Sequence, residues 1–228
     1  MPEPTIDAIG LNLTGLPDGR VDLLDRVFAE FRDHGCDHVE LTARRLDLIV
    51  GGRLHAARVD AVGAALDAAG LRATLHAHHG INLMDRADPE THRRAAEASV
   101  DICHRLGIAS MVIHSGVASR DLWQTDRAAL LAEERDAFRR LADVAGRAGV
   151  RLAVENMIAK PAGSPVVAYG AHPAALAEQL AVIDHPSVGA TLDFGHAWLS
   201  APLLGFDYLA ELEAVSPWVW HLHLHDNC

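Results

Sequence analysis

The 228-residue sequence has few cysteines, a single lysine and no long apolar run. Its three cysteines have no CxxC spacing and leave one unpaired, which is typical of structural thiols in a reduced protein. No charged-then-apolar signal segment opens the sequence, and no apolar run approaches the length of a membrane-spanning helix. We therefore expect a cytoplasmic protein without a membrane partner. The sequence has nineteen arginines and one lysine, Lys160, a bias that we interpret as compositional.

Three further absences narrow the class of protein. The net charge of −11 argues against a broad basic surface, so nucleic acid is not the expected partner. There is no Gly-rich loop of the kind that binds nucleotides. No linker or shift in composition divides the chain, and half of its residues are hydrophobic, enough for a large core. We expect a single domain over residues 1–228.

Apolar segments of strand length alternate with segments of helical period along the whole chain. Glycines such as Gly70 and Gly107 stand where helical segments end. The alternation predicts parallel strands joined by right-handed crossovers. The expected strands are 5–13, 37–41, 71–77, 108–114, 150–155, 187–193 and 218–224, and the expected helices are 21–34, 54–69, 88–106, 126–148, 173–183 and 206–215.

Six of the predicted strands end in a carboxylate or an imidazole, spaced 30 to 41 residues apart, about one strand-and-helix unit. They are Glu40, His76, His114, Glu155, Asp193 and His223. Their strand neighbours face the other way and are mostly apolar, which suits packing against helices. In a closed barrel of parallel strands, the six would point inward at the C-terminal rim, where active sites lie. An open doubly wound sheet would place them along a line. The sequence therefore predicts an α/β fold, a (β/α)8 TIM barrel.

Each of these residues also has a plainer interpretation. A single strand-end histidine is more often a core or rim residue than a ligand, whereas a carboxylate inside a barrel, such as Glu155, is costly unless it is paired or binds a metal. Near the C-terminus, His221, His223 and His225 share one face at different depths, which favours His223. Six strand ends of this composition predict a divalent-metal site. The histidines that we leave as core or rim residues are His38, His55, His92, His104, His172 and His185.

Five runs of sequence resemble the xylose isomerase-like barrel superfamily. They are Leu75-His-Ala-His-His-Gly-Ile-Asn-Leu83, Val112-Ile-His-Ser-Gly116, Ala153-Val-Glu-Asn156, Thr191-Leu-Asp-Phe-Gly-His196 and His221-Leu-His-Leu-His-Asp-Asn227. This group holds sugar isomerases, epimerases and dehydratases, and also the endonuclease IV-type apurinic endonucleases. The resemblance covers most of the chain, with the runs in order and at compatible spacing.

The resemblance implies different ligand sets in its two branches. In the isomerase and epimerase branch, Glu155, Asp193 and His223 match three of the four ligands of one divalent ion, and His196 matches a substrate-contacting histidine. In the endonuclease branch, a three-zinc cluster is implied, and that branch adds an Asp-x-His and a Glu that this sequence does not contain. The matching zinc ligands would be His76, His114, Glu155, Asp193, His196 and His223.

The function that we expect is a metal-dependent isomerase or epimerase acting on a sugar through an enediolate, with one divalent ion (Mn, Mg, Co or Zn). Glu155 is the candidate for moving the carbon-bound proton. The candidate substrate-binding residues are Glu40, His76, His114 and His196. Three alternatives remain: three-zinc cleavage of abasic DNA, a non-catalytic sugar-binding barrel, and a Schiff-base enzyme that uses Lys160.

The sequence departs from both branches at its end, because each continues to an eighth strand and a last metal-binding Glu. One further unit of about 37 residues would be needed for that strand. We therefore expect a C-terminal unit to be missing, either because the chain is a fragment or because a partner completes the barrel. The first and seventh predicted strands would then be open edges with a gap between them, and a homo-oligomer is one way to cover them.

Overall fold

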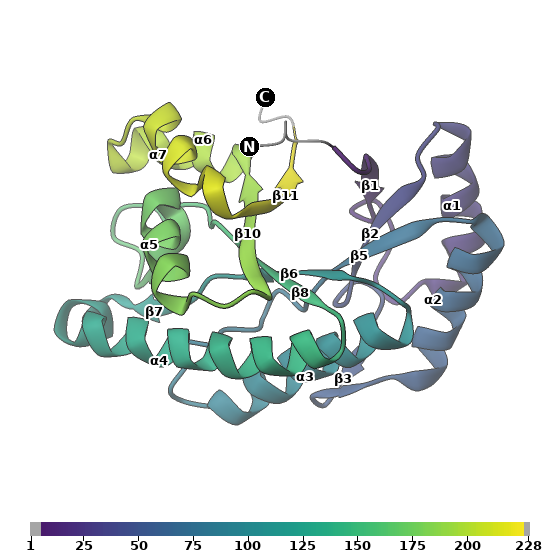
Figure 1. The fold of residues 1–228 in the computed structure, drawn as a ribbon, viewed down its shortest axis with the longest axis horizontal. Coiled ribbons are helices and arrows are strands. Elements are labelled where there is room, and N and C mark those ends of the chain that lie inside the picture. The colour runs from purple at the N-terminus through teal and green to yellow at the C-terminus, as the bar shows by residue number, and fades with distance from the viewer. Residues whose placement is uncertain (1–5, 226–228) are drawn as a thin grey trace.

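The computed structural model describes residues 6–225. Its main sheet has seven parallel strands in the order β1-β2-β5-β6-β8-β10-β11 and curves into an open half-barrel with helices on its outer side (Figure 1). The prediction of a TIM-barrel fold without an eighth strand is therefore confirmed. The strands are β1 (Gly10–Asn12), β2 (His38–Thr42), β5 (Arg72–His76), β6 (Ser110–His114), β8 (Arg151–Glu155), β10 (Val188–Asp193) and β11 (Val219–His223).

Helices follow the strands as parallel crossovers require. They are α1 (Leu24–Asp33), α2 (Ala56–Ala69), α3 (Pro89–Arg105), α4 (Arg120–Arg147), α5 (Pro173–Ile183), α6 (Phe194–Leu204) and α7 (Tyr208–Val215). Two antiparallel ribbons, β3–β4 and β7–β9, lie outside the predicted strands, and one of their residues, Leu54, was expected to begin a helix. Their strands are β3 (Ile49–Val50), β4 (Arg53–Leu54), β7 (Val117–Ser119) and β9 (Val166–Ala168). None of the described helices is both long and apolar enough to cross a membrane.

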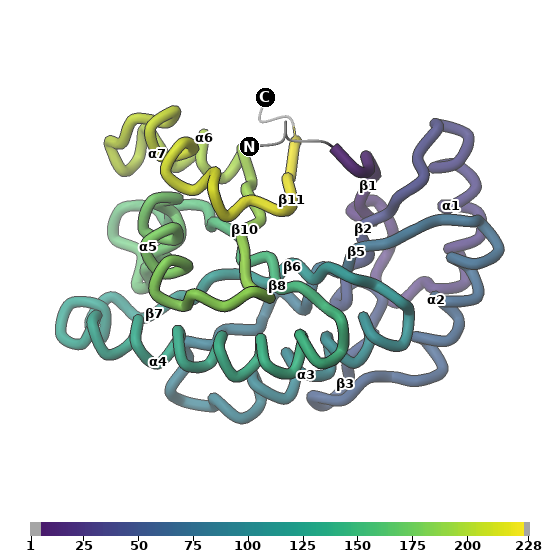
Figure 2. Tube along the Cα trace, in the orientation of Figure 1, coloured from purple at the N-terminus to yellow at the C-terminus, as the bar shows by residue number. Residues whose placement is uncertain are grey.

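The sheet is open between β1 and β11. These two strands stand at its ends, and no ladder joins them within residues 6–225, as the tube in Figure 2 also shows. The expected gap between the first and last strands is thus present. The first strand is shorter than the predicted 5–13, whose first residue lies outside the described part. Its three residues, Gly10–Asn12, pair only with β2, and all three are exposed.

The core lies between the outer face of the sheet and the helices. Outward-pointing side chains such as Leu75, Ile113 and Val154 are buried there with Phe28 and Phe138 from the helices. This confirms most of the predicted helix-facing positions. The exception is β11, where the expected burial is wrong. Leu222 is 42% exposed and Leu224 74% exposed, because β11 is the edge strand and no described helix covers its outer face.

Three helix predictions need correction. Helix α4 begins at Arg120, not Asp126, because the Ser119 hydroxyl accepts a hydrogen bond from Leu122 N (3.3 Å) and caps an earlier turn; Asp126 is the kink where two helical pieces meet. Helix α6 was not predicted. Its cap is Asp193, a residue assigned from the sequence only to a metal site. The last helix begins at Tyr208 instead of residue 206.

A buried carboxylate fixes the turn that follows β6. Glu134 of α4 accepts a hydrogen bond from the Gly116 amide (2.6 Å), two residues beyond His114. A Cβ at Gly116 would lie 2.6 Å from that Glu134 oxygen, so only glycine allows the approach. Burial raises the pKa of Glu134 to about 7, against the opposing hydrogen bonds of Tyr169, Gly116 and Gln179. This turn therefore depends on a carboxyl group that the folded state prefers to keep protonated.

This shift predicts a pH dependence of stability. The folded pKa lies above the ordinary value of 4.5, so the stabilisation is complete below about pH 4.5 and is lost as the pH rises through about 7. Relative to Glu134→Gln, the wild-type free energy of unfolding should fall by about 3 kcal/mol between pH 4 and pH 8. Urea unfolding at several pH values measures this. Glu178→Gln, at an exposed site on α5, controls for lost charge. A pH-independent difference for Glu134→Gln would contradict the assignment.

Candidate metal centre

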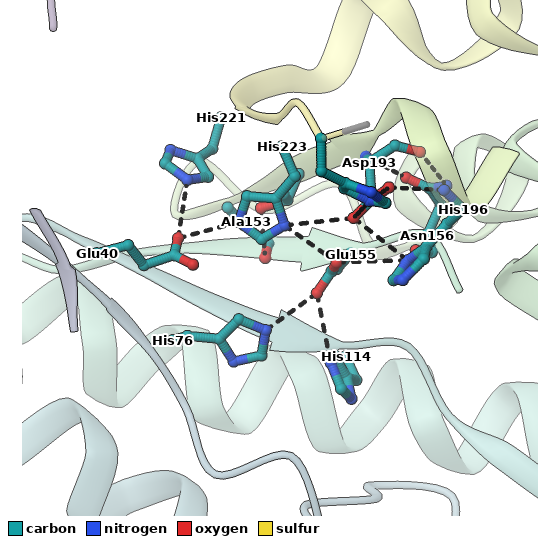
Figure 3. A network of polar contacts seen from close by, with 12 residues as sticks. Glu40, His76, His114, Ala153, Glu155, Asn156, Asp193, His196, His221 and His223 are labelled. Carbon is teal, nitrogen blue, oxygen red and sulfur yellow. Dashed lines mark hydrogen bonds and ion pairs between the residues drawn. The ribbon is translucent and has the colours of Figure 1, made fainter. Parts of the chain in front are cut away.

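The strand ends bring seven predicted site residues together on the concave side of the half-barrel (Figure 3). Strand register sets two of the neighbour relations directly, because His114 pairs with Glu155 across β6 and β8, and Asp193 with His223 across β10 and β11. The other relations come from side chains that reach across the concave face. The seven are Glu40, His76, His114, Glu155, Asp193, His196 and His223.

Glu155 lies at the centre of this group and is almost fully buried. Its Oε2 is 3.2 Å from His76 Nε2 and 3.4 Å from His114 Nε2. Its Oε1 is 3.1 Å from His223 Nδ1 and 3.5 Å from His196 Nδ1. One carboxylate thus meets four imidazoles, two on each oxygen.

Asp193 is held by its backbone as well as by its side chain. The amide of Asn156, directly after Glu155, donates to Asp193 O (3.0 Å), and its Oδ1 accepts from Asp193 N (2.7 Å). Asp193 Oδ1 caps α6 by accepting from His196 N (2.6 Å) and lies 3.0 Å from His225 Nε2. Its Oδ2 lies 3.7 Å from His223 Nδ1. The Asn156 clamp therefore fixes where this carboxylate stands relative to Glu155.

Glu40 reaches the group from β2, which lies near the opposite end of the open sheet from β11. Its Oε2 is 3.0 Å from His221 Nε2 and 3.0 Å from His223 Nε2. His223 consequently faces three carboxylates, with Glu40 at Nε2 and with Glu155 and Asp193 at Nδ1.

The electrostatics follow from this arrangement. Burial alone would raise the pKa of Glu155, but the hydrogen bonds of the neighbouring histidines outweigh it and hold that pKa well below its usual range. The same balance lowers the pKa values of Glu40 and Asp193. Burial lowers the pKa of His223, yet its three carboxylate partners raise it to about 12. The three carboxylates are thus kept ionised, which is the form in which carboxylates bind a divalent cation.

Four groups of side chains could each hold a metal ion, because their ligand atoms lie within 4.8 Å of one another. Glu155, Asp193 and His223 form one such group, the set expected from the sequence. The other three groups are His76, His79 and His114; Glu40, His221 and His223; and Asp193, His196 and His225. A donor set of two carboxylate oxygens and an imidazole fits Mn, Mg, Co or Zn.

Four residues of this centre were not among the site residues expected from the sequence. His79 lies in a loop that folds back, so that its ring centroid is 4.4 Å from that of His76. His221 contacts Glu40, and His225, beyond the end of β11, contacts Asp193. Asn156 carried one available signal, its position directly after a strand-end glutamate. The contacts of all four depend on side-chain directions that spacing does not fix.

The family relation agrees with this geometry. Residues 28–228 match the family described as xylose isomerase-like TIM barrel. The chain belongs to this family. No curated protein matches the sequence at a significant level.

Solved structures share the fold of this family member at low identity. A putative xylose isomerase from Rhodospirillum rubrum is 22% identical, with a TM-score of 0.76 over 95% of this chain and 76% of that chain. A xylose isomerase-like protein from Mycobacterium smegmatis in complex with magnesium is 17% identical (TM-score 0.71, 95% and 74% covered). A D-allulose 3-epimerase from Methylomonas sp. in complex with D-allulose is 14% identical (TM-score 0.70, 95% and 72% covered).

The geometry generates a direct test of metal binding. The double variant Glu155→Ala/Asp193→Ala should abolish tight divalent-metal binding, because it removes two of the three converging donors. Elemental analysis after dialysis against Mn²⁺ or Zn²⁺ measures the bound ion. The control Asp101→Ala/Glu178→Ala removes the same charge from exposed positions and should bind as the wild type does. Metal retained by the first variant would show that Glu155 and Asp193 are not the ligands of the ion.

Proposed function

We propose that this protein is a divalent-metal-dependent isomerase or epimerase that acts on a sugar or sugar derivative. The observation that carries the proposal is the convergence of Glu155, Asp193 and His223 at the C-terminal ends of three adjacent strands, β8, β10 and β11. Solved relatives support it: the Mycobacterium smegmatis protein binds magnesium and the Methylomonas epimerase binds D-allulose.

Glu155 Oε1, an Asp193 oxygen and His223 Nδ1 are the atoms that would hold the ion. When bound, the ion supplies Lewis-acid stabilisation of the negative oxygen that develops next to the deprotonated carbon. Water or substrate oxygens would fill the remaining ligand positions of the ion, as they do in catalytic sites of this type.

Glu155 is the candidate for moving the carbon-bound proton. Its two oxygens have different surroundings, because Oε1 faces His223 and Oε2 faces His76 and His114. We assign proton transfer to Oε2, since Oε1 is the oxygen that would hold the ion. His76, His114 and His196 are then the candidate substrate-binding residues, with hydrogen-bonding nitrogens around the same carboxylate.

Glu40 has a further role in this proposal, which is to orient His223. Its Oε2 accepts hydrogen bonds from the Nε2 atoms of both His221 and His223. His223 can bind an ion only after it loses one of its two ring protons. The hydrogen bond to Glu40 keeps the remaining proton on Nε2, so that Nδ1, the atom that faces Glu155 and Asp193, would become the nitrogen with a lone pair. The other Glu40 oxygen remains available for a substrate hydroxyl, the role expected from the sequence.

A second candidate function is phosphodiester cleavage by a multi-zinc cluster. The specific observation in its favour is the pair of additional groups, His76/His79/His114 and Asp193/His196/His225, which could hold further ions beside the first. The net charge of −11 disfavours binding to a polyanion. We therefore keep the isomerase or epimerase as the leading proposal.

The orienting role of Glu40 predicts a graded loss of metal affinity. Glu40→Ala should weaken Mn²⁺ binding by roughly 10- to 100-fold, the usual effect of losing such a partner. Glu40→Gln should recover part of this, because its amide oxygen can still accept from Nε2. Glu178→Ala is the control, since it removes the same charge from an exposed position. Competition with a chelator gives the affinities. The Co²⁺ absorption spectrum should change in Glu40→Ala and stay unchanged in Glu178→Ala; identical behaviour of the two variants would rule the role out.

Metal stoichiometry and hydrogen exchange separate the two functions. An isomerase or epimerase should bind one ion per chain and exchange a sugar's carbon-bound hydrogen with solvent deuterium, which NMR detects. His114→Ala should then keep the ion and reduce only the exchange rate. Two or three zinc ions per chain, loss of one of them in His114→Ala, and cleavage of an abasic duplex would establish the second function instead.

A further inference from the structure

A separate cavity of about 320 Å³ lies beside the β7–β9 ribbon. It is formed by the start of α4, by strand β9, by the loop that follows β8 and by the start of α5. Arg120, Trp123, Arg127 and Lys160 line it, and its lining contains no aspartate or glutamate. In a chain with a net charge of −11, this is a local reversal of charge.

The three cations of this cavity have no carboxylate partner among residues 6–225. Arg120 Nε donates to the Ser164 carbonyl (2.8 Å), which orients the guanidinium and leaves its terminal nitrogens for another acceptor. The Arg127 guanidinium lies 4.9 Å from the Trp123 ring centroid. Lys160 is half-buried, so its charge is partly desolvated without compensation. Elsewhere on the surface, arginines such as Arg93 are paired with glutamates.

A pair of stacked aromatic rings makes one wall of the cavity rigid. The Trp123 ring stacks on Tyr169, with 6.2 Å between centroids and planes inclined by 10°. The Arg127 guanidinium therefore lies over an aromatic ring whose position is fixed by stacking.

We propose that this cavity binds a phosphate group. Arg120 and Arg127 present planar donor groups suited to the oxygens of a phosphate, and Lys160 adds a point charge. The phosphate has two possible sources, a phosphorylated sugar or free inorganic phosphate, and both would use the same three cations. The site shares no residue with the metal centre, so it stands independently of the proposed isomerase function.

Isothermal titration calorimetry of the whole chain with inorganic phosphate tests the proposal. Arg127→Ala/Lys160→Ala should weaken phosphate binding by about tenfold or more, because two charge-assisted contacts are lost. Arg120 is left intact because it also holds the Ser164 carbonyl. The matched control Arg140→Ala/Arg147→Ala removes two exposed charges from the same helix and should bind phosphate as the wild type does. Both double variants should keep the bound divalent metal.

Two more ligands identify the source of the phosphate. A hexose 6-phosphate that binds more tightly than inorganic phosphate, while the free hexose does not compete for the cavity, assigns the site to a phosphorylated sugar. Equal binding of hexose phosphate and inorganic phosphate assigns it to free phosphate. Phosphate binding that is equal in the wild type and in Arg127→Ala/Lys160→Ala, or no saturable binding by the wild type up to about 10 mM, would overturn the proposal.

Discussion

Three carboxylates facing one imidazole are the constraint on which this centre depends. Glu40, Glu155 and Asp193 come from three different strands, and all of them approach His223. Buried like charges at such short range repel one another, so they persist only with positive charge between them. Protonated His223 supplies that charge within the chain, and a divalent cation bound at Nδ1 would take the place of its proton. Metal binding and the packing of the concave face are therefore aspects of the same electrostatic balance.

The same contacts compensate for an open sheet. Strand β11 has a ladder partner, β10, on one side only within the described residues, and its outer face is uncovered. The bonds from His221 and His223 to Glu40 tie it to β2 across the concave face. These polar contacts join the two arms of the half-barrel where backbone pairing does not. A change at Glu40 should therefore affect the position of β11 as well as the ligand that β11 carries.

The sequence alone was enough to find the seven strands of the main sheet and the residues at their C-terminal ends, because parallel-strand periodicity fixes both the face and the depth of a side chain. It could not show what those residues contact. Asp193 illustrates the limit, since it caps α6 while facing three imidazoles, and only the folded backbone reveals the helix that it caps. His79 lies close to His76 because of the conformation of its loop, and no periodic pattern in the sequence indicates that conformation. The exposure of Leu222 reflects an uncovered edge strand, which residue pattern does not encode.

The division between strand ends and loops also separates chemistry from selectivity. In the proposed function, an ion held by the carboxylates and imidazoles at the strand ends would stabilise a developing negative oxygen on many sugars, so these residues would define a reaction class without naming a substrate. Groups that distinguish one sugar from another must lie where the chain varies more freely, in the loops beyond the strands. Lys160 lies in the loop that follows β8, and Arg120 and Arg127 lie in the first turns of α4, which follows β7; together they give that region a charge opposite to that of the carboxylate-rich centre. A phosphorylated sugar would use both regions, the cavity for its phosphate and the metal centre for its carbon skeleton, whereas free phosphate would use the cavity alone.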